Sequence, residues 1–270
     1  MGWKIQHLLI LSFSIIAYSV KAAAIVDPRN NVPDPFSPSN WPLPHNITGY
    51  NSPGNWGGVH IHDPSIVIGP DGQFYSFSTH DLVSISRAPT LEGYWEHLGS
   101  VLVGASKINL PGNNDTWAPD VHLGPGGLYY CFYSVSTFGS QDSGIGLATS
   151  RELLPGTWTD HGLVYESGAT LPSPANITNA IDPNLFIDYD GTPLLTYGSF
   201  WSDIWQWQLE PDLSNIDYKV AADWLSLDPS GTHAEEGSYL HVHGWYYYLF
   251  FSHGICCGFN ASDLPPAGQE

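Results

Sequence analysis

Short apolar and aromatic runs alternate along the chain with clusters of glycine, proline, asparagine and aspartate. Runs of this length, bounded by turn-forming residues, are typical of β-strands, whereas helices need a longer pattern with a period of 3.6 residues. Helical periodicity is nearly absent, and the only candidate is a short segment, Arg151–Leu154, that Pro155 ends. The pattern therefore predicts an all-β fold.

One arrangement of these runs occurs four times. Each copy has a carboxylate, an apolar run, a turn that contains glycine, and a second run rich in apolar or aromatic residues. The paired runs lie at 65–78, 121–134, 184–199 and 238–252. The segments between copies can hold two further strands, as at 145–150 and 156–167. A four-stranded unit repeated in this way predicts the blades of a β-propeller, and two stacked β-sandwich domains are the alternative.

The carboxylates that open the four copies are Asp63, Asp120, Asp182 and Glu236, spaced by 57, 62 and 54 residues. The innermost strands of propeller blades line the central axis, so equivalent positions of these strands lie near one another. We therefore expect the carboxylates to meet at one mouth of the channel, where mutual repulsion and burial raise at least one pKa. Glycoside hydrolysis needs such a split between a protonated acid and an ionised base. Taken singly, an Asp-Pro pair is more often the start of a turn or strand.

The N-terminal residues have the features of a secretory signal peptide. Lys4 gives a positive start, Leu8–Tyr18 is apolar, and small residues follow up to Ala24. We expect residues 1–24 to be removed, and residues 25–270 to form one secreted propeller domain. Four N-x-S/T triplets agree with this route, and we expect N-glycans on some of them. The triplets begin at Asn46, Asn114, Asn176 and Asn260.

The composition narrows the choice of partner. The formal net charge is −19 with only 7 Lys and Arg, which argues against nucleic acid, an anionic membrane or a polyanionic sugar. After the leader, no segment approaches the roughly 20 apolar residues of a membrane span. Aromatic residues make up 14% of the chain, which fits β-sheet cores and also stacking platforms for sugars. We expect a monomeric protein with a neutral polysaccharide as its partner.

The three cysteines are Cys131, Cys256 and Cys257. An odd number leaves at least one of them unpaired within the chain, and three are too few for a disulfide scaffold. Cys256 and Cys257 could bridge each other only with strain, or one of them could pair with Cys131. C-x-x-C spacing is absent, which argues against a structural zinc site.

Six short motifs follow one another along the chain. They are His62–Ile66 (HDPSI), Trp117–Val121 (WAPDV), Ser136–Ser140 (STFGS), Asn179–Pro183 (NAIDP), Tyr197–Trp201 (YGSFW) and Glu235–Leu240 (EEGSYL). In sequence and order they resemble glycoside hydrolase family 43, and within it the fungal and bacterial endo-1,5-α-L-arabinanases. The resemblance implies a five-bladed propeller that hydrolyses with inversion. The fourth copy begins close to the end of this chain, whereas the family continues, so the resemblance also implies that the C-terminal blade is truncated.

The resemblance assigns the carboxylates. Asp63 corresponds to the general base that activates water, and Glu236 to the general acid. Asp182 corresponds to the third carboxylate, which as a negative neighbour raises the pKa of the acid and orients it. Strand alternation points Glu235 away from Glu236, so Glu235 is left out of the set. Asp120 is not one of the family's three, and we expect a supporting hydrogen-bond role for it.

The same motifs carry the substrate contacts that the family implies, for which packing at strand ends is the alternative role. The expected contacts are Asp63, Gly139, Asn179, Ala180, Ile181, Asp182, Ser199, Phe200 and Trp201. Asp203 stands where a small residue is more usual, a change expected to alter a subsite and not the chemistry.

The expected chemistry requires no cofactor and no metal ligand. Members of the family hold a calcium or other cation on the propeller axis, largely through water and a histidine of the final blade, so a structural calcium is an expectation of the resemblance. This chain has no clear equivalent of that histidine. The nearby histidines are expected to be structural, and they are His233, His241, His243 and His253.

The function that these features predict is a secreted inverting hydrolase that cuts internal α-1,5 bonds of arabinan. An exo-acting α-L-arabinofuranosidase or β-xylosidase, with one end of the channel blocked, is the first alternative. A catalytically inactive, truncated propeller that binds carbohydrate is the second.

Overall fold

The computed structural model describes residues 8–14, 61–91, 93–229 and 231–254, which form four β-sheets. Three sheets each contain four antiparallel strands in chain order, and we call them blades 1, 2 and 3. Blade 1 contains β2 (Ser65–Ile68), β3 (Phe74–Ser78), β4 (Ser84–Ala88) and β5 (Glu96–Ser100). Blade 2 contains β6 (Trp117–Leu123), β7 (Tyr129–Val135), β8 (Ser143–Ser150) and β9 (Thr159–Ser167). Blade 3 contains β10 (Asn184–Ile187), β11 (Pro193–Tyr197), β12 (Ile204–Gln208) and β13 (Asp223–Ser226).

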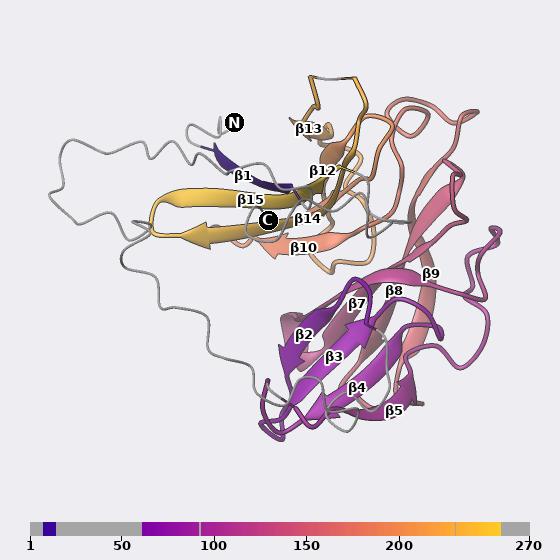
Figure 1. The fold of residues 1–270 in the computed structure, drawn as a ribbon, viewed down its shortest axis with the longest axis vertical. Coiled ribbons are helices and arrows are strands. Elements are labelled where there is room, and N and C mark those ends of the chain that lie inside the picture. Colours follow the sequence, from indigo (N-terminus) through magenta and orange to yellow (C-terminus); the bar gives the residue numbers. More distant parts are fainter. Residues whose placement is uncertain (1–7, 15–60, 92, 230, 255–270) are drawn as a thin grey trace, which may run out of the picture.

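The fourth sheet, blade 4, is the hairpin of β14 (Glu235–His243) and β15 (Tyr246–His253) with β1 (Leu8–Ser14) added along β15 (Figure 1). β1 lies within the predicted signal peptide and pairs with β15 in parallel. All other paired strands in the described part of the chain are antiparallel, and each pairs with the strand that follows it directly in the sequence.

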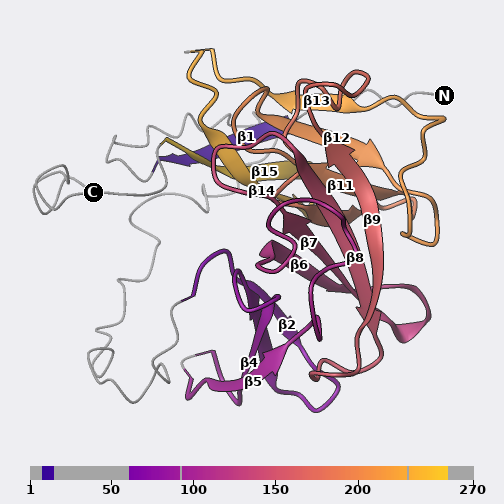
Figure 2. The same ribbon diagram turned by 90° about the vertical axis from the view of Figure 1, so that its right-hand side faces the viewer.

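The sheets follow one another in series instead of stacking as two sandwiches (Figures 1 and 2). β2 contacts β6, β6 contacts β10, and β10 contacts β14, so the first strand of each blade is its innermost. A separate cluster of buried side chains lies between each pair of successive blades. Phe77 and Tyr133 lie in the first cluster, Phe132 and Leu195 in the second, and Ile204 and Leu249 in the third. The propeller prediction is therefore confirmed, and the two-sandwich alternative is wrong.

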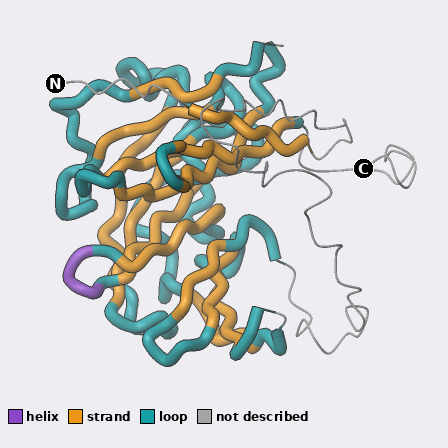
Figure 3. The backbone as a smooth tube through the Cα atoms, turned by 90° about the vertical axis from the view of Figure 1, so that its left-hand side faces the viewer, coloured by secondary structure: helices purple, strands orange, loops and turns teal. Residues whose placement is uncertain are grey.

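The only helical candidate in the sequence, Arg151–Leu154, is not a helix. The segment is a series of bends between β8 and β9, and Leu153, only 1% exposed, packs with Trp158 into the core between blades 1 and 2. The buried Leu153 thus anchors a connecting loop. In the sequence, this apolar residue among polar neighbours resembles the pattern of a short helix. Within the described residues, the only helical turn is a 3₁₀ turn, Pro125–Gly127, between β6 and β7 (Figure 3).

One type of hydrogen bond joins each blade to the next. A polar side chain on an innermost strand accepts the backbone N–H of a residue on the following innermost strand. Val121 donates to Ser65 Oγ at 3.0 Å, Leu185 donates to Asp120 Oδ2 at 2.6 Å, and Leu240 donates to Asn184 Oδ1 at 2.8 Å. These amides lie on inner strands, where water could not easily replace the hydrogen bond if the side chain were removed. Each side chain therefore stabilises the contact between two blades.

These bonds correct the predicted register of Asp120. Because Asp120 is equivalent to Ser65 and Asn184, it lies two residues beyond the position of Asp63 and Asp182. The position of Asp63 and Asp182 is occupied in blade 2 by Ala118, and the three residues share a left-handed backbone, with φ of 49°, 56° and 40° respectively. The expected supporting role of Asp120 is confirmed, since it ties blade 2 to blade 3.

Two of the predicted glycosylation sites lie in described segments. Asn114 is exposed, whereas Asn176 is half-buried. Asn46 and Asn260 lie outside the described residues, as do Cys256 and Cys257. Cys131 is free and buried in β7. No helix in the described ranges has the length and apolar character to cross a membrane.

Candidate active site

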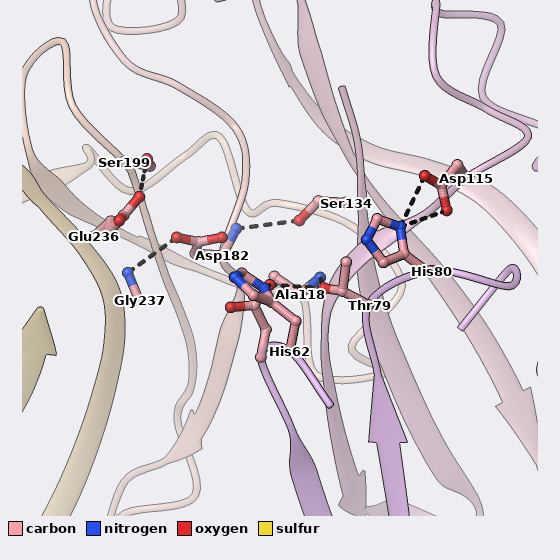
Figure 4. Close-up of polar contacts among 11 residues, drawn as sticks. His62, Thr79, His80, Asp115, Ala118, Ser134, Asp182, Ser199, Glu236 and Gly237 are labelled. Carbon is pink, nitrogen blue, oxygen red and sulfur yellow. Dashed lines mark hydrogen bonds and ion pairs between the residues drawn. The ribbon is translucent and has the colours of Figure 1, made fainter. Parts of the chain in front are cut away.

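The three carboxylates of the predicted set come together at the same end of the innermost strands. Asp63 precedes β2, Asp182 precedes β10, and Glu236 lies at the start of β14. Asp182 is close enough to the other two for their charges to raise its pKa. Its Oδ2 accepts the N–H of Gly237, the residue next to Glu236, at 3.0 Å (Figure 4). The propeller thus assembles in space three groups that the sequence separates widely.

Glu236 is held by Ser199, whose hydroxyl donates to Oε2 at 2.8 Å (Figure 4). Burial raises the pKa of Glu236, and the negative charge of Asp63 raises it further. The hydrogen bond from Ser199 and the imidazole of His62 lower this pKa in part. The balance keeps Glu236 protonated at a higher pH than a free glutamate, as a general acid requires.

Asp182 also has a pKa well above its ordinary value. Burial is the largest cause, followed by the charges of Asp63 and Glu236, while the hydrogen bond from Gly237 acts in the opposite direction. Asp182 was expected to be the negative neighbour that raises the pKa of Glu236. The structure shows the reverse coupling: the charge of Glu236 raises the pKa of Asp182, and the charge that raises the pKa of Glu236 is that of Asp63. In the free protein the pKa values of Asp182 and Glu236 are both raised, so the three carboxylates do not all ionise together. The backbone N–H of Asp182 is fixed by Ser134 Oγ at 3.1 Å.

Asp63 contacts two side chains through the same oxygen. Thr79 Oγ1 donates to Asp63 Oδ2 at 2.7 Å, and His62 Nδ1 lies 2.6 Å from the same atom. The Thr79 hydroxyl in turn accepts the N–H of Ala118 at 2.8 Å. Sequence reasoning missed Thr79 and Ser134, although a serine or threonine at the end of each second strand was a visible signal.

Some of the predicted substrate contacts are buried, and others are exposed. Ala180 and Ile181 are buried, so their side chains support the loop that carries Asp182. Asn179 is buried as well, and its Nδ2 donates to the carbonyl of Ser199 at 3.1 Å, which couples two of the motifs. Trp201 is 37% exposed and follows Phe200, and both have a left-handed backbone. Gly139 occupies a turn after β7 with φ of 77°.

Glu235 faces away from Glu236 and joins a separate acidic cluster of the described residues. Burial raises its pKa, and so do the charges of Asp203 and Asp228. Asp203 is fully buried, accepts the N–H of Asp228 at 2.9 Å, and pairs with His233 Nδ1 at 2.9 Å. This contact raises the pKa of His233. His233 therefore has a structural partner, and Asp203 acts in packing between blades 3 and 4.

The part of the chain that the structure describes contains no group of three or more His, Cys, Asp or Glu side chains arranged to hold a metal ion. The axial calcium that the resemblance implies, held largely by water and one histidine, stays a prediction.

Replacing Ser199 with alanine is expected to move the alkaline limb of the kcat/KM profile to higher pH. The hydroxyl stabilises the ionised form of Glu236, so its loss raises the pKa of Glu236, and a general acid is active while protonated. The kcat/KM profile of the variant against pH measures this shift. Ser202→Ala is the control, because Ser202 lies in the same loop as Ser199 but its Oγ donates to the backbone carbonyl of Ile177. A limb that stays in place or moves to lower pH would contradict the assignment.

A propeller that presents a raised-pKa carboxyl group beside two further carboxylates at the end of its inner strands has the site of a glycoside hydrolase. Comparison with known proteins agrees, and the chain belongs to glycosyl hydrolases family 43, whose family model matches residues 58–264.

Three proteins similar to this chain show how it relates to other members of the family. The chain is 49% identical over 227 residues to arabinan endo-1,5-alpha-L-arabinosidase A of Aspergillus niger, a match that covers 83% of this chain and 68% of that protein. It is similar to a solved exo-1,5-alpha-L-arabinanase from a bovine ruminal metagenomic library, with TM-score 0.65 and 33% identity, over 73% of this chain and 66% of that one. It is also similar to Cellvibrio cellulosa alpha-L-arabinanase complexed with arabinohexaose, with TM-score 0.64 and 27% identity, over 74% and 66%. The chain thus spans about two thirds of the length of these relatives.

Proposed function

We propose that the protein is an inverting hydrolase that cuts internal α-1,5 bonds between arabinofuranose units of arabinan. One observation carries this proposal. Asp63, Asp182 and Glu236 converge at one end of the propeller, in a chain 49% identical to an arabinan endo-1,5-alpha-L-arabinosidase.

The reaction uses the base and the acid in one step. Asp63 removes a proton from a water molecule, and the oxygen of that water attacks the anomeric carbon on the face opposite the leaving group. The bond from the anomeric carbon to the glycosidic oxygen breaks, and that oxygen takes the proton of Glu236. The new hemiacetal has the inverted configuration, and proton exchange with solvent restores both carboxyl groups.

Asp182 supports the acid in two ways. Its Oδ2 binds the N–H of Gly237 and so fixes the backbone that carries Glu236. Its proximity also opposes the simultaneous ionisation of Asp182 and Glu236. A proton is therefore retained on this pair at a pH where isolated carboxylic acids are ionised.

A neutral polymer is the substrate class that suits the chain. The net charge of −19 would repel a polyanion, and the exposed Trp201, two residues after the Ser199 that contacts the acid, offers an apolar face to a sugar ring. The alpha-L-arabinanase from Cellvibrio cellulosa, a relative in fold and sequence, has been seen with arabinohexaose. We also propose that the protein acts outside the cell, which the predicted signal peptide and the exposed Asn114 support.

The test is hydrolysis of linear α-1,5-arabinan, followed by product size and by the anomeric configuration of the first product. Short oligosaccharides with inverted configuration, absent for Glu236→Ala, are expected. Release of single arabinose units would instead favour exo action, the second candidate, which the similarity to an exo-1,5-alpha-L-arabinanase supports. Arabinan binding without any hydrolysis would contradict both and leave a carbohydrate-binding propeller.

A further inference from the structure

Asp63 needs a device that fixes its orientation. It lies just before β2 on a left-handed backbone, and its side chain is 38% exposed, so burial alone does not hold the carboxylate in place. A general base must present one oxygen to water in a defined direction, because small displacements of a reacting group cost large factors in rate. The contacts of its two oxygens show how this is achieved.

The Thr79 hydroxyl has only one orientation that satisfies its neighbours. The N–H of Ala118 can only donate, and it points at Thr79 Oγ1 from 2.8 Å. The single hydroxyl hydrogen is therefore free to point at Asp63 Oδ2, 2.7 Å away, which as an ionised carboxylate oxygen can only accept. A backbone amide of blade 2 thus sets the direction of a hydrogen bond to the base in blade 1.

Thr79 is itself fixed by the fold. Its side chain is buried, with the residue 7% exposed, and it directly follows β3. Its backbone N–H donates to the carbonyl of His62 at 3.0 Å, which ties it to the residue that precedes Asp63. Ala118, the donor, occupies in blade 2 the left-handed position that Asp63 occupies in blade 1. The hydroxyl is therefore pre-positioned on three backbone segments before any substrate binds.

Both contacts fall on one oxygen of the base. Thr79 Oγ1 donates to Asp63 Oδ2 and His62 Nδ1 lies 2.6 Å from the same atom, whereas no described residue donates to Oδ1. The His62 side chain is 60% exposed and Thr79 is buried, so Thr79 is the contact that the fold fixes. With respect to the described residues, Oδ1 keeps its lone pairs available for a water molecule.

We propose that Thr79 is a positioning residue for the base: relayed from the Ala118 N–H, its hydroxyl holds Asp63 Oδ2 so that Oδ1 receives the proton of the attacking water. This inference rests on the proposed hydrolytic function. In the step, an O–H bond of water breaks and an Oδ1–H bond forms, while the electron pair of that water bond becomes available for the new bond to the anomeric carbon. Oδ2 becomes the carbonyl oxygen of the neutral acid and still accepts from Thr79.

Thr79→Val tests the proposal because valine keeps the shape and removes the hydroxyl. We expect kcat on arabinan to fall about 10- to 100-fold, since a misplaced reacting group costs factors of this size, with KM changed less than about twofold. Thr79→Ser restores the hydroxyl and is expected to recover most of kcat. If Thr79 acted on stability alone, its loss would not lower kcat while leaving KM nearly unchanged. Nor would the hydroxyl of Thr79→Ser restore kcat.

Thr196→Val is the matched control. Thr196 is fully buried on the second strand of blade 3, and its hydroxyl accepts from Gln206 Nε2 at 3.0 Å. This variant is expected to lose thermal stability but to keep the kcat of the wild type. The proposal is overturned if Thr79→Val retains kcat, if it lowers kcat no more than Thr196→Val, or if Thr79→Ser is as impaired as Thr79→Val. If Thr79→Val does not fold, Thr79→Ala takes its place because it also removes the hydroxyl, and a folded Thr79→Ala that keeps the kcat of the wild type overturns the proposal. An inactive wild type would refute the proposed function itself, which is a distinguishable result.

Discussion

Replacing Glu236 with glutamine is expected to lower kcat on arabinan about 10²- to 10⁴-fold, the range that general acids contribute. Glutamine keeps the length of the side chain and the contact with Ser199, but it has no proton to give to the leaving oxygen. Substrate binding should change little, so KM stays within a few-fold. The loss should be much smaller on an aryl glycoside whose phenol leaves without protonation.

Glu235→Gln is the control for this experiment. The substitution is identical and one residue away, but Glu235 faces Asp203 and Asp228 and not the catalytic carboxylates. Its kcat is expected to stay close to that of the wild type, with altered stability. If Glu235→Gln lost as much activity as Glu236→Gln, or if the aryl substrate suffered the full loss, Glu236 would not be the acid.

Replacing Asp120 with alanine is expected to cost about 3–5 kcal/mol of unfolding free energy, as when one partner of a buried charged contact is removed. Asp120 is buried, accepts the Leu185 N–H at 2.6 Å and the Asn184 side-chain amide at 3.3 Å, and pairs with His122 Nε2 at 2.8 Å. Alanine would leave three polar groups without this partner at the junction of blades 2 and 3. Urea unfolding followed by tryptophan fluorescence measures the change.

Two further variants sharpen this result. Asp120→Asn keeps an acceptor for the Leu185 amide and loses the charge opposite His122, so its destabilisation should lie between those of the wild type and alanine. Asp190→Ala removes an exposed turn aspartate whose hydrogen bonds are local and come from Thr192, and it should cost about 1 kcal/mol or less. An Asp120→Ala protein as stable as Asp190→Ala would show that the bond between blades contributes little.

The arrangement of strands could be predicted from the sequence because it depends on local features. Turn residues, alternation and strand length recur in every copy, and they placed the hairpins β2–β3, β6–β7, β10–β11 and β14–β15 correctly. The meeting of Asp63, Asp182 and Glu236 also followed, since equivalent ends of inner strands lie at one mouth of a propeller.

The register of Asp120 could not be predicted from spacing. β6 has an irregular register between Trp117 and Asp120, and β14 has one between Glu236 and Tyr239. An irregularity of this kind changes the count of residues along one strand without changing the turns that bound it. The position of a carboxylate therefore depends on backbone details that a count between motifs does not contain.

The hydrogen-bond partners of the carboxylates could not be predicted from the sequence for a different reason. The bonds from Thr79 to Asp63 and from Ser199 to Glu236 connect residues that are separated by 16 and 37 positions. Serine and threonine are common at the ends of strands, so their presence there does not show which carboxylate each one contacts. Only the arrangement of the blades in space shows which hydroxyl reaches which carboxylate. The buried contact of Asp203 with His233 was missed for the same reason.

The bonds between blades have a fixed direction along the chain. In each of the three, the accepting side chain precedes the donating amide in the sequence: Ser65 before Val121, Asp120 before Leu185, and Asn184 before Leu240. During synthesis a chain emerges from its N-terminal end, and earlier units fold first. Every acceptor is therefore already synthesised when its donor leaves the ribosome. Each folded blade thus presents a hydrogen-bond acceptor to the blade that folds after it.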